Sequence, residues 1–191
     1  MKTEAEVLEK LLSWAEATPE VRAVIMTSSR ARPDGVIDAL SDYDIIFATT
    51  AGFDTDWTAD WLSAYGEPMV RWGDEGEVLG HKTFFRGIVY QDHVKIDYTV
   101  WSCEILESVA SSPVLPTELD AGYRVLMDKD GATKNWATPT YRAFIPHSPN
   151  QTEYQAIVEE FWWVSTYVAK SLWRGEPVFA RWVLTADLRD G

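Results

Sequence analysis

The sequence has few of the residues on which several protein classes depend. A single cysteine, Cys103, among 191 residues excludes an internal disulfide, a cysteine-based zinc site and a secreted fold held together by disulfides. No apolar run approaches the ~20 residues that a membrane-spanning helix needs. Glu4, Glu6 and Glu9 interrupt the N-terminal segment where a signal peptide would be apolar. We therefore expect a cytoplasmic protein without a membrane partner.

Basic residues are also scarce. The chain has 17 Lys and Arg against 30 Asp and Glu, and its formal net charge is -13. General nucleic-acid binders usually carry the opposite balance, so we expect no nucleic-acid partner. From Asp34 to Glu77 there are eleven acidic residues and one basic residue, Arg71. This segment favours a cationic ligand, although a solvated acidic face explains it equally well.

The apolar pattern predicts a mixed α/β domain followed by helices. Short apolar, β-branched runs predict strands at 21–27, 43–49, 69–72, 84–90, 94–101 and 123–128. Helical spacing predicts helices at 3–17, 55–65, 104–111 and 152–173, the last with Thr152 as N-cap, and a further helix beginning at 179. Residues 74–80 are predicted to form a loop. We therefore divide the chain into an α+β domain over residues 1–137 and a linker with a partial helical region over residues 138–191.

Three carboxylates form a candidate metal site. Asp42 and Asp44 begin a predicted strand, where residues i and i+2 point to the same side about 6–7 Å apart, which suits a shared divalent cation. Asp97 lies inside another predicted strand, where a carboxylate is costly unless it is exposed, paired or metal-bound. Adjacent strands lie about 4.8 Å apart, so Asp97 could reach the same ion. Alternatively, Asp42 and Asp44 are ordinary exposed acids, and Asp97 pairs with Lys95 on its own face.

A polar turn provides a candidate phosphate site. The strand over 21–27 runs into Ser28 and Ser29, whose backbone N–H groups could meet phosphate oxygens, and Arg30 could add a charge-assisted contact. An ordinary polar turn is the alternative. The succession of strand, serine turn, Asp42-Tyr43-Asp44 and a later strand aspartate resembles the nucleotidyltransferase superfamily that includes DNA polymerase β.

Longer segments resemble the aminoglycoside 6-adenylyltransferases that modify streptomycin. In order and spacing, the resemblance is carried by MKTEAEVLEKLL, VRAVIMTSSR, LSDYDIIF, WLSAYGEPM, HVKIDYT, RVLMDKDG and EEFWWVSTYVAKSLWRGE, and it covers essentially residues 1–185. It implies a polymerase β-like nucleotidyltransferase domain, a mixed sheet flanked by helices, followed by the start of a helical C-terminal domain. It also implies transfer of AMP from ATP to a hydroxyl of a cationic aminoglycoside, with release of pyrophosphate.

The same resemblance implies the roles of individual residues. Asp42 and Asp44 would bind Mg²⁺, and Asp97 would act as a further metal ligand or as the general base. The residues implied to contact the phosphates of ATP are Ser28, Ser29, Arg30 and, on the long helix, Lys170.

The sequence departs from the family pattern in two ways. Ser28 stands where the family usually has glycine, and serine is costly there if the backbone needs a positive φ. Family members are also longer, so we expect either a shortened protein or an active site completed by another subunit. A non-catalytic nucleotide- or drug-binding relative, and a nucleotidyltransferase with another acceptor, remain as alternatives. The oligomeric state is left open.

Overall fold

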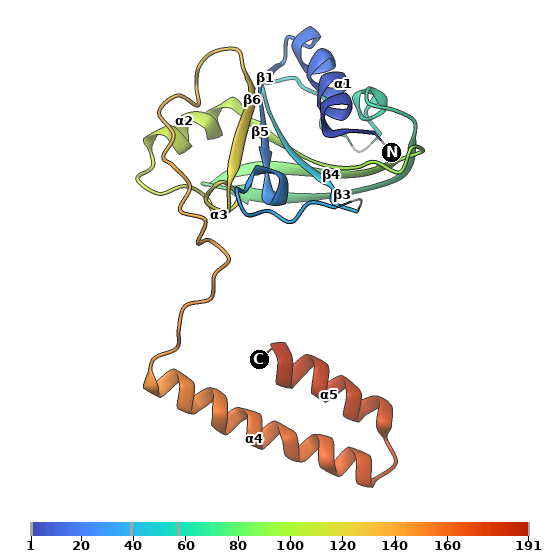
Figure 1. Ribbon diagram of the computed structural model, residues 1–191, viewed down its shortest axis with the longest axis vertical. Helices are drawn as coiled ribbons and strands as arrows, with labels where there is room; N and C mark the ends of the chain where they lie inside the picture. The colour runs from blue at the N-terminus through green and yellow to red at the C-terminus, as the bar shows by residue number, and fades with distance from the viewer. Residues whose placement is uncertain (1, 39, 57, 191) are drawn as a thin grey trace. The chain divides into compact units, whose positions relative to one another are not determined.

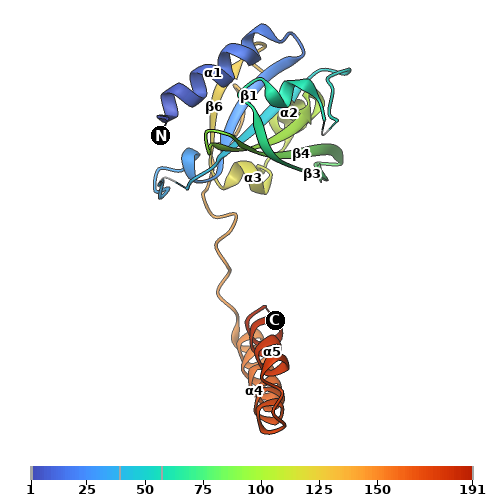
Figure 2. The same ribbon diagram turned by 90° about the vertical axis from the view of Figure 1, so that its right-hand side faces the viewer.

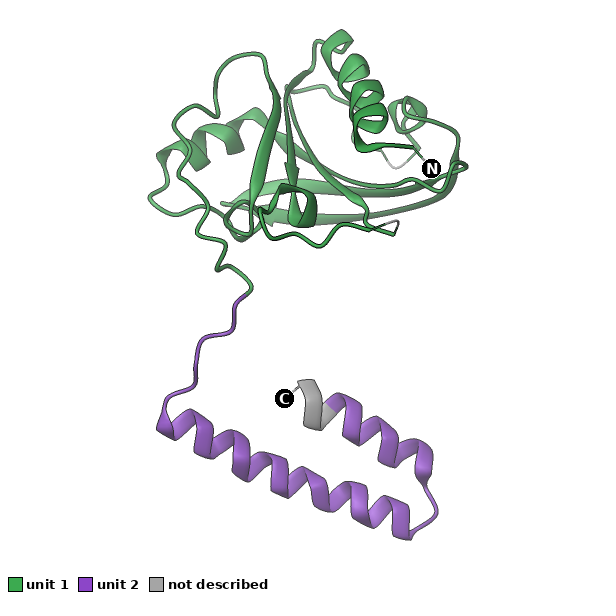
Figure 3. Cartoon of the chain, viewed as in Figure 1, with its two compact units in different colours: residues 1–144 green, residues 145–191 purple. Residues whose placement is uncertain are grey.

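The computed structural model of the chain describes the backbone of residues 2–38, 40–56 and 58–190, and side chains as far as residue 186. It contains two compact units, Met1–Phe144 and Ile145–Gly191 (Figure 3). Within the described residues, no helix has both the length and the apolar character that crossing a membrane requires.

The first unit is built on a mixed sheet of six strands in the order β3-β4-β5-β2-β1-β6 (Figure 1). The strands are β1 (Val21–Thr27), β2 (Tyr43–Thr49), β3 (Pro68–Val78), β4 (His81–Tyr90), β5 (Lys95–Ser102) and β6 (Tyr123–Asp128). The helices are α1 (Glu4–Ala17), the 3-10 turns η1 (Ser28–Ala31) and η2 (Asp60–Ser63), α2 (Cys103–Ser111) and α3 (Thr117–Asp120). β2 and β5 are parallel, and the other neighbouring strands are antiparallel. The predicted α+β class, a mixed sheet flanked by helices, is confirmed.

Alternation along the strands produces two hydrophobic cores, one on each face of the sheet. On one face, α1 packs Val7 and Leu11 against alternate strand residues such as Phe47. On the other face, α2 packs Ile105 against the residues in between, such as Ile46. Figures 1 and 2 show the helices and the sheet from two directions. Because both faces are apolar, a polar side chain that points from the middle of this sheet must reach a cavity or an edge.

The structure corrects the predicted loop at 74–80. β3 continues to Val78, and a two-residue turn at Leu79 and Gly80, both with positive φ, leads directly into β4. The prediction was wrong because β3 is an edge strand with mostly exposed side chains. Such a strand is held by its backbone pairing with β4, and the polar run 73–77 therefore needs no apolar alternation.

The predicted helix at 55–65 is also wrong, since only η2 forms there; Trp57 lies outside the described residues. Just before η2, the Asp54 carboxylate accepts the backbone N–H of Asp56, and the Asp56 carboxylate accepts that of Thr58, at 2.9 and 2.7 Å. These side chains bond to the backbone groups that a helix would use, and thereby favour turns.

The second unit is a pair of helices, α4 (Gln151–Trp173) and α5 (Pro177–Asp190). The predicted N-cap Thr152 is wrong by two residues: the Asn150 side chain accepts the N–H groups of Thr152 and Glu153 in a capping box. Gly175, with φ 72°, follows the end of α4 as predicted. Pro177 begins α5, two residues before the predicted start at 179.

Residues 138–144, which the sequence analysis places in the linker, belong to the first compact unit. The carboxylate of Asp120 accepts both the backbone N–H and the hydroxyl of Thr140, at 2.7 and 2.6 Å. The backbone N–H of Tyr141 bonds the Asp120 carbonyl at 2.9 Å. These bonds tie the start of the predicted linker to the end of α3.

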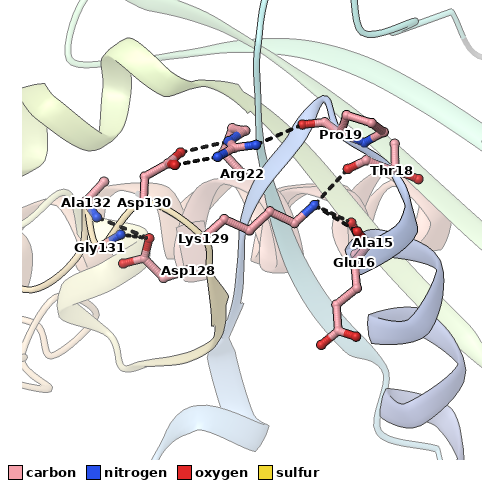
Figure 4. Close-up of polar contacts among 10 residues, drawn as sticks. All are labelled: Ala15, Glu16, Thr18, Pro19, Arg22, Asp128, Lys129, Asp130, Gly131 and Ala132. Atoms are coloured by element: carbon pink, nitrogen blue, oxygen red, sulfur yellow. Dashed lines mark hydrogen bonds and ion pairs between the residues drawn. The ribbon is translucent and has the colours of Figure 1, made fainter.

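The turn after β6 holds the C-terminal end of α1 (Figure 4). The ammonium of Lys129 donates to the carbonyl oxygens of Ala15, Glu16 and Thr18 at 2.9, 3.2 and 2.8 Å. Next to it, Arg22 forms a two-pronged ion pair with Asp130. The last carbonyls of a helix lack partners within the helix, and a cation there also complements the helix dipole. Lys129 therefore fixes the helix that covers one face of the sheet.

We expect Lys129→Met to lower the free energy of unfolding by about 1–2 kcal/mol, because it leaves these carbonyl oxygens without their donor. Urea unfolding followed by circular dichroism measures the change. Lys134→Met, which removes an exposed lysine from the same turn region, is the matched control and should change stability little. Equal losses in the two variants would contradict the capping role.

Candidate active site

A cavity of about 260 Å³ opens on the sheet face that carries α2. Four carboxylate side chains line it, those of Asp44, Glu77, Asp97 and Glu118. The described lining residues include no lysine, arginine or histidine. A group of acids with no cationic side chain among the lining residues attracts cations, either metal ions or a cationic ligand.

Asp44 and Asp97 lie side by side in this cavity. β2 and β5 run parallel in a register that sets Asp44 directly opposite Asp97. Residues that are paired in this way point to the same face of a sheet. Their neighbours Tyr43, Ile96 and Tyr98 point into the core under α1. Asp97 is therefore on the same sheet face as Asp44, an arrangement that the alternation in the sequence allowed but left open.

Asp42 lies one residue before β2 and is linked to Asp97 by a lysine. The ammonium of Lys95 contacts Asp42 Oδ2 at 2.6 Å and Asp97 Oδ2 at 2.5 Å. The pairing of Asp97 with Lys95, which the sequence left open as an alternative, is thus present. Within the described part of the chain, no three Asp, Glu, His or Cys side chains form a ready metal-binding group.

The second oxygen of Asp97 provides a test of whether the residues suit a metal. Asp97 Oδ1 is buried, and none of the described residues donates a hydrogen bond to it. Gly87 on β4 leaves it room, because a Cβ there would stand 3.1 Å from this oxygen. A buried carboxylate oxygen without a partner costs free energy, and such oxygens are the ligands that Mg²⁺ prefers. The donor set of Asp97 and its neighbour Asp44 therefore fits a hard divalent cation.

Electrostatics at Asp44 agree with this assignment. Burial, reinforced by the nearby negative charges of Asp42 and Asp97, raises the pKa of Asp44 to about 6, against opposing effects of Ser28 and Lys95. Concentrated like charge in a partly buried site is the environment that a bound cation relieves.

The serine turn lies at the rim of the same cavity, where Ser28 is a lining residue. Ser28 has φ 57°, so its backbone is in the left-handed region that glycine adopts most easily. The sequence indicated that serine would be unfavourable here if the backbone needed a positive φ. The structure shows that the backbone does adopt a positive φ at this position. Ser29 follows in η1, and Gly35 packs so tightly against it that a Cβ would stand 1.9 Å from the Ser29 carbonyl oxygen. Gly35 is a supporting residue that the sequence analysis missed.

Arg30 supports the loop that carries Asp42. Its guanidinium donates to the carbonyl oxygens of Asp42 and Ser41 at 2.7 and 2.9 Å, pairs with Glu4 and lies over the ring of Tyr43. Its side chain is only 9% exposed. These contacts give Arg30 a positioning role that sequence reasoning did not foresee, since the partners lie more than ten residues away.

Lys170 belongs to the second compact unit, whereas the residues above belong to the first. It lies on α4 in the second unit, is exposed, and has its ammonium 5.0 Å from the ring centre of Tyr167. The cavity and its carboxylates belong to the first unit.

The Streptomycin adenylyltransferase family matches residues 1–190. An aminoglycoside 6-adenylyltransferase from Campylobacter jejuni is 30% identical over 186 residues, covering 94% of this chain and 61% of the relative. One from Bacillus subtilis (strain 168) is 28% identical over 184 residues, covering 94% and 63%.

A solved structure, an aminoglycoside 6-adenyltransferase from Bacillus subtilis, has 24% identity and a TM-score of 0.47, covering 99% of this chain and 64% of that one. The chain thus spans less than two thirds of the length of these relatives. The resemblance found in the sequence is confirmed by the family match, which extends over both compact units. The chain belongs to the Streptomycin adenylyltransferase family.

Proposed function

We propose that this chain transfers AMP from ATP to a hydroxyl group of a streptomycin-like aminoglycoside and releases pyrophosphate. The observation that carries the proposal is the pairing of Asp44 and Asp97 on adjacent parallel strands, with one buried oxygen of Asp97 lacking a partner among the described residues. The names of the relatives support the reaction class.

In the proposed reaction, the acceptor hydroxyl oxygen forms a bond to the α-phosphorus of ATP. The bond from that phosphorus to the oxygen bridging to the β-phosphate breaks, and pyrophosphate leaves with the electron pair. In this proposal Asp97 Oδ1, which has no partner among the described residues, would accept the hydroxyl proton, since general-base catalysis requires a free oxygen within hydrogen-bond reach. The alternative role for Asp97, as a metal ligand, uses the same free oxygen.

Asp42 and Asp44 are the proposed holders of Mg²⁺, which would supply neutralisation of the charge on the triphosphate. The backbone N–H groups of Ser28 and Ser29, at the end of β1, are proposed to hold phosphate oxygens. By the family resemblance, Lys170 on α4 would contact the triphosphate as a point charge.

The cavity also supports a cationic acceptor. Glu77 and Glu118 line it in addition to the two aspartates. Trp101, another lining residue, is almost fully buried, and its Nε1 has no partner among the described residues. A hydroxyl oxygen of a positively charged ligand could accept a hydrogen bond from the Trp101 N–H, and its ammonium groups could pair with the two glutamates. The volume of about 260 Å³ is below the roughly 300–1,000 Å³ that encloses a whole drug-sized ligand, so one ring of a larger molecule would enter.

Streptomycin incubated with the protein, ATP and Mg²⁺ should gain the mass of one AMP unit in mass spectrometry. Asp44→Asn should reduce this product at least ~10²-fold, because it removes charge stabilisation at the transferring phosphoryl group. Asp60→Asn, which removes an exposed acid in η2, is the control and should leave the yield unchanged. No AMP product with the native chain would favour the binding-only alternative.

Asp44 should also make stability depend on pH in the metal-free protein. Its pKa rises from 3.8 to about 6 on folding, so between these values the folded chain binds more protons than the unfolded chain. The free energy of unfolding should therefore fall as pH rises through this window. Urea unfolding in EDTA at pH 4.0 and 7.5 should show Asp44→Asn gaining stability relative to the native chain at the higher pH. A constant difference between the two proteins would contradict the raised pKa.

The strained turn predicts an unusual response to glycine. Ser28→Gly should leave the free energy of unfolding unchanged or raised by up to about 1 kcal/mol, because relief of the positive φ offsets the extra freedom of unfolded glycine. Ser29→Gly is the matched control; without that relief it should lose about 0.5–1 kcal/mol. Thermal unfolding compares the two. Similar losses in both variants would show that Ser28 is not strained.

A further inference from the structure

Lys95 contacts two of the three active-site carboxylates at once. It begins β5, two residues before Asp97 and on the same face of the strand. Its ammonium lies 2.6 Å from Asp42 Oδ2 and 2.5 Å from Asp97 Oδ2. The hydrogen bonds to these acids outweigh burial and raise the pKa of Lys95. Among the described contacts, no other cationic side chain bonds either carboxylate; the bonds of Arg30 go to the backbone of the Asp42 loop.

From this geometry we propose that Lys95 occupies the cation position of the active site while no metal is bound, and yields it when a divalent cation enters. The inference rests on the proposed function, since it takes Asp42 and Asp97 as metal ligands. Three neighbouring carboxylates repel one another, and one ammonium in direct contact with two of them offsets part of that repulsion.

The ammonium and a metal ion cannot both occupy the Oδ2 atoms of Asp42 and Asp97. Mg²⁺ lies about 2.0–2.1 Å from its oxygen ligands, and the lysine nitrogen already makes close contact with one oxygen of each carboxylate. A divalent ion that bridged Asp42 and Asp97 would place two cations in contact. A metal bound through these Oδ2 atoms therefore exchanges with Lys95. A metal held by the free Asp97 Oδ1 would still lie near the positive charge of Lys95. In both cases the lysine lowers the apparent affinity of the site for metal.

Lys95 has room to leave. Its side chain is 44% exposed, and it lines a second cavity of about 330 Å³ together with Arg30 and Tyr43. The flexible lysine stem lets the ammonium move into water, where its charge is solvated. Its partner Asp97 is more deeply buried, with a side chain that is only 13% exposed. The carboxylates thus stay in place while the lysine moves.

The test measures binding of Mn²⁺ alone, without nucleotide, from the electron paramagnetic resonance signal of free Mn²⁺. We expect Lys95→Met to bind Mn²⁺ at least ~10-fold more tightly than the native chain. The control is Lys82→Met, which removes the lysine of a surface pair with Glu75 at 2.7 Å and should leave the affinity unchanged. Adding Asp44→Asn to Lys95→Met should abolish the gain, which locates the ion.

Each outcome decides the proposal. Equal or weaker Mn²⁺ binding by Lys95→Met overturns the exchange role alone. Absence of Mn²⁺ binding in both the native chain and Lys95→Met overturns the metal site as well, and the AMP product assay then shows separately whether the proposed function survives. Lys95→Gln, a polar substitution at the same exposed strand start, provides the same comparison if the methionine variant does not fold. Thermal unfolding in EDTA should show a lower midpoint for Lys95→Met than for Lys82→Met, restored by Mn²⁺.

Discussion

The parallel pairing of β2 with β5 is the constraint on which the candidate site depends. Its register sets Asp44 opposite Asp97, and a slip of one residue would turn one of these carboxylates into the core under α1. The register is held by apolar residues on both faces, such as Ile45 on one side and Ile46 on the other. Hydrophobic burial therefore stabilises an arrangement of like charges that electrostatics alone would oppose.

The surroundings of the pair reduce that repulsion and keep one oxygen available. Lys95, at the start of the inner strand β5, neutralises part of the charge. Arg30 holds the backbone of the Asp42 loop and is itself fixed by Glu4 of α1. Gly87 leaves space beside Asp97 Oδ1. The backbone of the site is thus held by several contacts, and the cation beside its carboxylates stands on a flexible side chain.

One of the strained backbone positions lies where phosphate is proposed to bind. Ser28 adopts a left-handed conformation. Gly35 lies so close to the Ser29 carbonyl that the backbone of the turn has little room to shift in that direction. Such a strained conformation persists only where contacts with the surrounding structure hold the backbone in place. The hydrogen bonds of Lys129 at the far end of α1 are part of that support, because α1 also carries Glu4, the partner of Arg30.

The sequence by itself determined the features that depend on near neighbours: the alternation that puts Lys95, Asp97 and Thr99 on one face, the α+β class, and the break at Gly175. Tertiary structure alone decided the length of β3, which its pairing with β4 creates, and the roles of Arg30 and Lys95. Lys95 meets Asp42 across 53 positions of the chain. Local patterns report spacings of two to four residues, whereas contacts between distant segments exist only once the strands have paired and both cores have formed.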